Sequence, residues 1–262
     1  MTQSLRLAIY ACVAGSMALA SCTSASDRGI AFESRTDSCA YVTPDLYGDT
    51  VYSIASYKMV WPVRIGNNDL SELHDSLLTC TFDTIAADFS KATEHFFRKG
   101  PVDGLELTLL PANMDQARKA EKSNELVSNG YISLLTPELI VFGIDNYGYL
   151  YGAAHGYGTS DYINYSIADN SILTAANLFE PDKTGNVVAT VRNAARELYP
   201  GGEVNPDEIT DISTFRISPR QIIFVFQPYD IAPYSMGVVE IPVQTYDLYE
   251  ALSPLGHKVL GI

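Results

Sequence analysis

The sequence predicts an α+β fold, with mostly antiparallel sheets and a few packed helices. Two stretches rich in β-branched and aromatic residues each contain several strand-like segments in succession, at residues 131–167 and 212–243. Segments with apolar residues at helical spacing lie outside these stretches instead of alternating with single strands. Strands that follow one another without a helix between them favour antiparallel neighbours.

The first part of the chain is expected to form one strand and two helices. Val51–Val60 is rich in β-branched and aromatic residues, and Trp61-Pro62 should end this strand because proline cannot donate a ladder hydrogen bond. Leucines spaced three or four residues apart predict a helix over residues 70–78. Phenylalanines and alanines at the same spacing predict a second helix over 85–98, which should stop at Gly100-Pro101.

The middle of the chain predicts a meander of strands. Gly104–Leu110 alternates apolar and polar residues, as a strand does, whereas residues 113–128 fit either a long edge strand or a helix. Three further strands are then expected in sequence, broken by Thr136-Pro137 and by a glycine-rich loop over 152–158. Their ranges are 131–135, 139–151 and 161–167.

The last third predicts a helix followed by more strands. Residues 174–178 read as a short helical turn, and 184–199 as a longer helix that ends at Pro200-Gly201-Gly202. Three strands and a small amphipathic helix should follow, at residues 212–217, 221–227, 236–243 and 245–252.

The N-terminus predicts secretion and a lipid anchor. An apolar run from Leu7 to Ala20 follows one cation, Arg6, and is too short to cross a bilayer core of roughly 30 Å as a lasting helix. Leu19-Ala20-Ser21-Cys22 closes the run and resembles the lipobox of bacterial lipoproteins. The resemblance implies a signal peptide over residues 1–21 and diacylglycerol on Cys22. The alternative is an ordinary signal peptide cleaved at a small-residue site, with the cysteine incidental.

The residues after the anchor predict a location. Thr23 is not the aspartate that retains many lipoproteins in the inner membrane. Of the outer and the inner membrane we therefore favour the outer one for this cell-envelope protein, on either face. Residues 22–44 are expected to hold the anchor and a tether, of which Thr23 to about Gly29 is small and polar.

Length and charge limit the number of domains and the kinds of partner of the mature protein. Without residues 1–21, which hold one cation and no acid, 241 residues remain and the net charge changes from −14 to −15. This length is enough for one large or two small domains. We expect no nucleic-acid partner, because binding a phosphate backbone needs clustered lysine and arginine.

Two cysteines remain in the mature part, Cys39 and Cys80. An oxidising envelope compartment would allow a Cys39–Cys80 disulfide, but sequence alone leaves two separate thiols equally open. Neither cysteine has a CxxC partner, and the four histidines share no ligand spacing. We therefore expect neither a metal nor a cofactor.

The densest group of candidate binding residues lies between residues 146 and 165. Alternation along a strand places Tyr147, Tyr149 and Tyr151 on one face, and Tyr157 follows them. Exposed tyrosine rings could contact a protein or stack on sugar rings. The alternative, which we favour from sequence, is that the stripe packs under a helix or a facing sheet, since tyrosine is common in antiparallel strands.

His155 is the best single candidate for a chemical role, because it lies in the glycine-rich loop near Asp145 and Asp161. The alternative function to binding is therefore an envelope-polymer hydrolase that uses His155 with Asp145 or Asp161. The chain contains no G-x-S-x-G, H-E-x-x-H or G-K-[ST] motif. We therefore favour the interpretation that His155 only fixes the loop through hydrogen bonds to the backbone. We assign no catalytic residue.

Several motifs, in order, resemble the C-terminal sensor domain of RsiV-type anti-sigma factors, the domain-of-unknown-function family 3298. They are Leu150-Tyr151-Gly152-Ala153-Ala154-His155, Tyr162-Ile163-Asn164-Tyr165, Leu173-Thr174 with Leu178-Phe179, and Phe224-Val225-Phe226-Gln227-Pro228-Tyr229-Asp230-Ile231-Ala232-Pro233-Tyr234 with Gly237. Ala153 stands where the family often has the second glycine of a Gly-Gly-Ala-His loop. Upstream, Met59-Val60-Trp61-Pro62 and the helix after it resemble the N-terminal domain of PdaC-type deacetylases.

The resemblance implies two similar-sized α+β subdomains, PdaC-like over residues 45–151 and RsiV-like over 152–262. In RsiV-type proteins the C-terminal domain binds lysozyme, whereas no catalytic residue comes with the resemblance. Asp49-Thr50-Val51, Asp75-Ser76-Leu77 and Asp83-Thr84-Ile85 also resemble an O-glycosylation acceptor of Bacteroidetes envelope proteins. We expect a non-enzymatic envelope lipoprotein that binds a lysozyme-like protein or peptidoglycan, with Tyr147, Tyr149, Tyr151, His155 and Tyr157 as contact candidates. A mainly structural lipoprotein is the third possibility.

Overall fold

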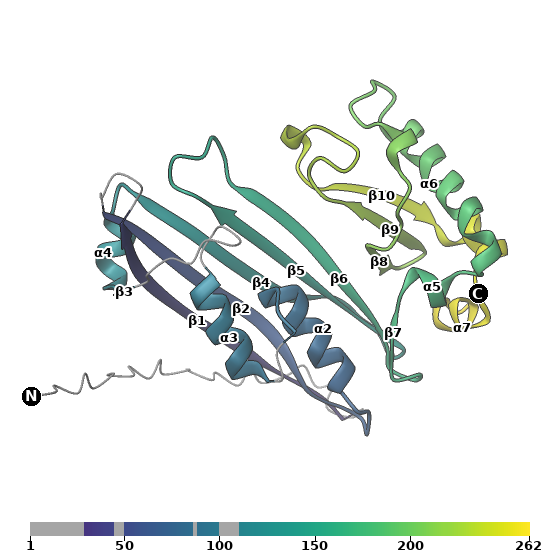
Figure 1. Ribbon diagram of the computed structural model, residues 1–262. Helices are drawn as coiled ribbons and strands as arrows, with labels where there is room; N and C mark the ends of the chain where they lie inside the picture. Colours follow the sequence, from purple (N-terminus) through teal and green to yellow (C-terminus); the bar gives the residue numbers. More distant parts are fainter. Residues whose placement is uncertain (1–28, 45–49, 86–87, 100–109) are drawn as a thin grey trace, which may run out of the picture.

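The computed structural model describes residues 29–44, 50–85, 88–99 and 110–262, which form two β-sheets with flanking helices (Figure 1). The larger sheet has the strand order β3-β1-β2-β4-β5-β6-β7 and the smaller has the order β10-β9-β8. Neighbouring strands are antiparallel except β2 and β4, which are parallel. The expected α+β fold with mostly antiparallel sheets is confirmed.

The large sheet is built from a long hairpin and a meander joined by the parallel pair. Its strands are β1 (Ile30–Pro44), β2 (Thr50–Ile65), β3 (Leu110–Pro111), β4 (Ser123–Leu135), β5 (Leu139–Tyr149), β6 (Tyr157–Ser166) and β7 (Ser171–Leu173). The expected meander is confirmed in β4 to β7. The proposed signal peptide, Cys22 and residues 104–109 of an expected strand lie outside the described residues.

Three details of the expected chain course are corrected. β1 pairs along its whole length with β2, so the fold begins by Ile30 and the tether cannot extend to residue 44. β2 does not end at Trp61-Pro62: Pro62 lies opposite Phe32, where a register shift absorbs the missing ladder donor. The ambiguous residues 113–128 contain a short helix, α4 (Met114–Lys119), and then enter β4, which is an interior strand.

Two helices cover one face of the large sheet. α2 (Ser71–Phe82) contacts β4 to β7, and α3 (Phe89–Lys99) contacts β2. They confirm the two expected helices, although the second begins at Phe89 instead of Ile85. Between helices and sheet lies a core that we call the helix-side core, in which the Tyr57 ring contacts four phenylalanines, Phe82, Phe89, Phe96 and Phe97.

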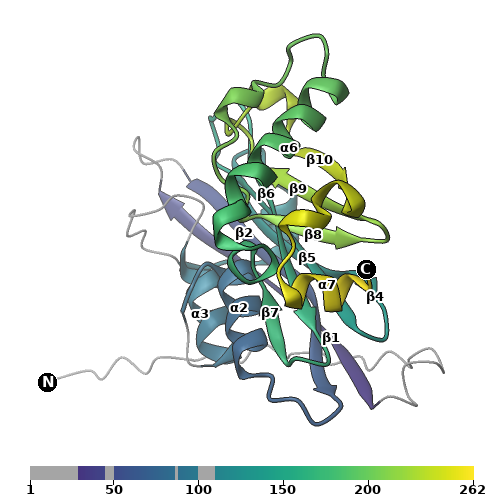
Figure 2. The ribbon, with the colours of Figure 1, turned by 90° about the vertical axis from the view of Figure 1, so that its right-hand side faces the viewer.

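The small sheet and the C-terminal helices pack on the opposite side of the large sheet, with α6 outermost (Figures 1 and 2). The strands are β8 (Phe215–Ser218), β9 (Gln221–Phe226) and β10 (Val239–Gln244). The α-helices are α5 (Ala175–Leu178), α6 (Thr184–Leu198) and α7 (Pro254–Leu260), and 3₁₀ turns occupy η1 (Pro181–Lys183), η2 (Pro206–Glu208), η3 (Tyr234–Met236) and η4 (Thr245–Ala251). The expected helical turn and long helix are confirmed; α7 was not foreseen.

A second core, the C-terminal core, fills the space around the small sheet. α6 buries one face completely there, at Val187, Val191 and Ala195. β5 contributes to both cores because its side chains alternate: Val141 belongs to the C-terminal core and Phe142 to the helix-side core. The large sheet also continues past residue 151 through β6 and β7, so the expected boundary between the two subdomains falls between two neighbouring strands of one sheet.

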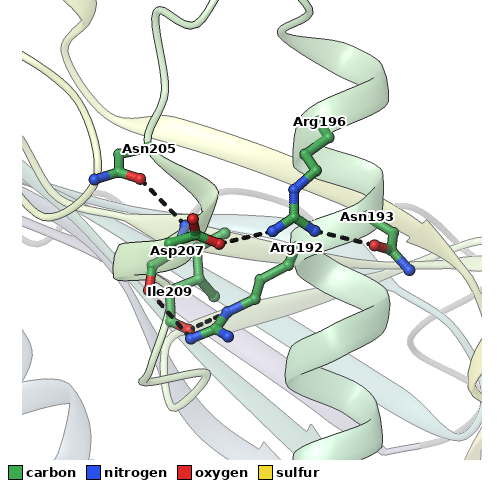
Figure 3. Close-up of polar contacts among 6 residues, drawn as sticks. All are labelled: Arg192, Asn193, Arg196, Asn205, Asp207 and Ile209. Atoms are coloured by element: carbon green, nitrogen blue, oxygen red, sulfur yellow. Dashed lines mark hydrogen bonds and ion pairs between the residues drawn. The ribbon is translucent and has the colours of Figure 1, made fainter.

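Two side chains connect the C-terminal elements: one joins the small sheet to the large sheet, and the other joins residues 207–209 to α6. Asn164 of β6 donates to the carbonyl of Phe215 over 2.8 Å and accepts from the amide of Ile217 over 2.8 Å, which joins the large sheet to β8. Arg192 of α6 donates to the carbonyls of Ile209 and Asp207 over 3.0 and 3.1 Å (Figure 3). Both interactions satisfy backbone groups that the sheets leave unpaired.

The exposed side of α6 carries a weaker addition to this attachment. Arg196 pairs with the Asp207 carboxylate at 2.7 Å and donates to Asn193 over 3.1 Å (Figure 3). Because both charged side chains are exposed, the ion pair itself adds at most about 1 kcal/mol. Within the described residues, no helix combines the length and the apolar character that crossing a bilayer requires.

Candidate functional site

The loop between β5 and β6 holds most of the candidate residues from the sequence. Gly152 turns the chain with a φ of +88°, and the amide of Ala153 donates to the carbonyl of Leu150. At the end of the loop, a Cβ on Gly156 would lie 2.3 Å from the Tyr147 hydroxyl, so the absence of a side chain lets the Tyr147 ring cover the loop. The loop is therefore closely packed.

A second loop, from the small sheet, packs against the first. The rings of His155 and Tyr234 are stacked with centroids 3.7 Å apart and planes 20° apart, and the Tyr234 hydroxyl donates to the carbonyl of Gly156. The Tyr229 ring lies 5.6 Å from that of Tyr234. Tyr157 begins β6 on the opposite face of the sheet from Tyr147, but its hydroxyl is near enough to Tyr229 and Asp230 for them to raise its pKa. We call Tyr147, His155, Tyr157, Tyr229 and Tyr234 the tyrosine cluster.

Polar contacts attach the second loop to β6. The Gln227 side chain accepts from the amide of Ser160 over 3.0 Å and donates to the carbonyl of Ser160 over 2.8 Å. The Asp230 carboxylate accepts from the amide of Gln227 over 2.7 Å, which fixes the turn that carries Tyr229. Tyr229 itself has a φ of +76°, a strained conformation for a residue with a side chain. Strain of this kind is often found at binding sites.

The rings of the cluster are accessible. Tyr147, Tyr157 and Tyr229 are 40, 45 and 60% exposed, whereas Tyr234 is half-buried between them. Partial burial and the nearby Asp230 and Tyr229 raise the pKa of the Tyr157 hydroxyl, which keeps it a neutral donor at physiological pH. The favoured expectation that the tyrosine stripe packs under a helix or a facing sheet is thus wrong for Tyr147.

The remaining two candidates lie outside the cluster. Tyr149 is half-buried and pairs with Glu125 of β4. Tyr151 is exposed at the start of the loop, where its amide donates to Asn124 over 2.8 Å and Lys122 lies 5.8 Å from its ring. The structure therefore brings together three of the five candidates and adds Tyr229 and Tyr234. The sequence signal for the added pair is the motif that runs from Phe224 to Tyr234, which resembles the family but does not by itself indicate a site.

The geometry around His155 does not assemble an acid–base pair. Its Nδ1 lies 2.9 Å from the carbonyl of Gly156, and among the described residues no carboxylate contacts the ring. Asp145 accepts from the Ser160 hydroxyl over 2.7 Å. Asp161 lies on the other face of the sheet, beside α2, because its neighbour in register is Ile144 of the helix-side core. In the part of the chain that is described, no three His, Cys, Asp or Glu side chains gather as metal ligands would.

Cys39 and Cys80 are thiols and are not joined to each other. Cys39 lies on β1, whereas the carbonyl of Cys80 on α2 accepts from Asn146 of β5 over 2.9 Å. The structure therefore does not contain the disulfide that the sequence allowed.

The Cys80 thiol should be unreactive. Burial, reinforced by the negative charge of Asp161, raises the pKa of Cys80 to about 12. Since the thiolate is the nucleophile, alkylation of Cys80 by iodoacetamide at pH 8 should be about a thousandfold slower than that of an ordinary cysteine, and should accelerate as the pH rises. Peptide mapping measures this rate, with the urea-unfolded protein as control. Equal rates in the folded and unfolded protein would show that the thiol is not shielded.

Comparison with known proteins supports this fold. Residues 176–246, which run from α5 to η4, match the family described as "Protein of unknown function (DUF3298)". No curated protein sequence matches the chain.

Two solved structures share the architecture over most of the chain. One is a member of the DUF3298 family from Bacteroides fragilis, with 19% sequence identity and a TM-score of 0.66 over 90% of this chain and 99% of that one. The other is a DUF3298 family protein from Pseudomonas aeruginosa, with 14% identity and a TM-score of 0.57 over 84% of this chain and 94% of that one. Residues 176–246 thus form a DUF3298 domain, within a fold that these two proteins share.

Proposed function

We propose that the protein is a non-enzymatic binding module of the bacterial cell envelope, and that the tyrosine cluster contacts a protein ligand. The observation that carries this proposal is the set of exposed rings, Tyr147, Tyr157 and Tyr229, supported by the half-buried Tyr234. Tyrosine supplies apolar area and a polar tip with few rotatable bonds, and it is enriched among the residues that dominate binding energy at interfaces.

The packing beneath the rings supports a binding role. Stacking of His155 on Tyr234 joins the two loops, and two hydrogen bonds between Gln227 and Ser160 attach the second loop to β6 before any ligand arrives. Loops that are already ordered lose less conformational entropy on binding. The hydrolase alternative finds no such support, because Asp145 and Asp161 lie on opposite faces of the sheet and neither contacts His155.

The favoured ligand is a basic protein of the lysozyme type. The mature chain carries a net charge of −15 once residues 1–21 are removed, and Asp230 is exposed beside Tyr229. Charge of this sign favours encounter with a cationic partner. The similarity of the loop motifs to RsiV-type sensor domains points to the same partner class. Acylated Cys22 would hold the module at the outer membrane, within reach of proteins that enter the envelope.

Calorimetric titration of the fragment Thr23–Ile262 with lysozyme, and separately with peptidoglycan fragments, tests this function. Physiological salt is essential, because a strongly acidic protein attracts a basic enzyme nonspecifically when screening is weak. Saturable binding of lysozyme that persists at higher salt is the expected result. Saturable binding of peptidoglycan fragments alone would replace the protein ligand by a glycan, and no heat with either would refute the proposed function.

A further inference from the structure

A cavity of about 460 Å³ lies between the C-terminal end of α2 and the large sheet, on the face opposite to the small sheet. Its wall includes the last turn of α2, Phe96 of α3, Leu126 of β4, Asn146 of β5 and the start of β6. The volume lies within the range of small-molecule sites, which are mostly apolar with a few converging polar groups.

Two polar groups in the wall have no hydrogen-bond partner among the described residues. Asp161 makes no hydrogen bond or ion pair among the described residues, although burial and the charge of Asp145 raise the pKa of its carboxyl group. The hydroxyl of Thr81 is fully buried and also lacks a hydrogen-bond partner in the described structure. Asp161 is half-buried and lines the cavity. A carboxylate that is partly removed from water and has no partner gains from one, so Asp161 points to a ligand that supplies it.

The electrostatics of the cavity favour a cation. The carbonyl end of α2 carries partial negative charge, and its last turn contains no basic residue to offset it. Asp83, which ends the helix, adds a second carboxylate at the wall. No lysine, arginine or histidine is among the described residues that line the cavity. Phe82, Phe96 and Tyr157 offer aromatic surface, which attracts both apolar groups and cations.

We infer that this cavity binds a small organic cation, an amine with an apolar body. The ammonium group would lie between the Asp161 carboxylate and the last turn of α2. The apolar body would contact Phe82, Phe96 and Tyr157. The inference does not depend on the tyrosine cluster being an interface, since Tyr157 is the only residue common to both sites.

Phenethylamine and 2-phenylethanol form a matched pair of probes, because they share shape and apolar area and differ in the charged group. Titrating each into the purified ¹⁵N-labelled protein, we expect phenethylamine to shift the amide signals of Thr81, Phe82 and the Asn146 side chain saturably in the millimolar range. The loss of one charge-assisted hydrogen bond should weaken the alcohol about tenfold. Equal affinity of the two probes, or the absence of saturable shifts with the amine, would overturn the inference.

Two substitutions locate the charge that matters. Asp161→Asn should weaken phenethylamine about tenfold and leave 2-phenylethanol unchanged. Asp145→Asn is the matched control: this residue is the neighbouring carboxylate on the other face of the sheet, and asparagine still accepts from the Ser160 hydroxyl. Thermal unfolding checks both folds, which should persist because Asp161→Asn removes only an unpaired charge. The same amine affinity in both variants would overturn the inference, and the probe comparison on the unsubstituted protein remains decisive whatever the variants do.

Discussion

Replacing Asn164 by alanine is expected to lower the free energy of unfolding by about 3–4 kcal/mol, since it leaves two buried backbone groups unsatisfied. Asn164 is 1% exposed and bonds both the carbonyl of Phe215 and the amide of Ile217. These two bonds attach β8 to the large sheet across the C-terminal core, and no water can replace the lost amide without opening that core. Urea unfolding followed by circular dichroism measures the change.

An exposed asparagine supplies the control for this substitution. Asn193 lies on the outer side of α6, where its side chain only accepts from Arg196 (Figure 3). Asn193→Ala should change the free energy of unfolding by less than about 0.5 kcal/mol. A loss of similar size in both variants would mean that Asn164 has no special role in joining the sheets.

Replacing Phe224 by alanine is expected to cost about 3–5 kcal/mol, because it opens a cavity at the centre of the C-terminal core. Phe224 is fully buried on the middle strand of the small sheet, with the rings of Phe215 and Phe179 6.3 and 6.4 Å away. The loss should also reach the other core. Val141 and Phe142 are adjacent on β5 and belong to different cores, so neither core can unfold without disturbing the strand that both need.

The single tryptophan makes this coupling measurable. Trp61 lies in the helix-side core, stacked on His74 with centroids 4.3 Å apart, so its fluorescence reports that core alone. In the Phe224→Ala variant, the Trp61 fluorescence transition should shift by the same amount as the circular dichroism transition. A Trp61 transition that stays at its original denaturant concentration would show that the two cores unfold independently. Tyr246→Ala, at a side chain 73% exposed, should shift neither.

Local pattern predicted the helices and most strands, because periodicity in these segments reports a single buried face. α6 is an example: Val187, Val191 and Ala195 repeat at helical spacing and all lie in one core. β1 was missed because it sits near the sheet edge and directs charged residues toward the helix side. There the Arg35 guanidinium lies over the rings of Trp61 and Phe89 and bonds Glu33 at 2.5 Å, so charges occupy positions where a pattern analysis expects apolar residues.

β4 was ambiguous for a related reason. Asn124 and Ser128 are buried on its helix side, which removes the alternation that identifies a strand. Asn124 is tolerated there because it donates to the Ser53 hydroxyl over 3.0 Å and accepts from the amide of Tyr151. Such compensation depends on residues far away in the sequence, and no local window contains it.

The sequence predicts the part of the candidate site that comes from one loop, but not the part that comes from the small sheet. Tyr147, His155 and Tyr157 are close in sequence, and the glycine-rich loop between the strands indicated that they would be neighbours. Tyr234 reaches them from 78 residues beyond Gly156, through the packing of the small sheet on the large one. A local sequence pattern does not report how two sheets pack. It therefore predicts neither the exposure of the tyrosine rings nor the stacking of His155 on Tyr234.

The most direct test of the central claim, that the tyrosine cluster is the binding surface, is a lysozyme titration of two matched double variants at physiological salt. Tyr157→Ser with Tyr229→Ser removes two exposed rings of the cluster, and Tyr246→Ser with Tyr249→Ser removes two exposed rings on η4. We predict that the cluster variant binds lysozyme about a hundredfold more weakly than the unsubstituted protein, as expected for residues that dominate an interface. The η4 variant should bind within about twofold of it. Equal affinity of the two variants would contradict the assignment of the binding surface to the tyrosine cluster.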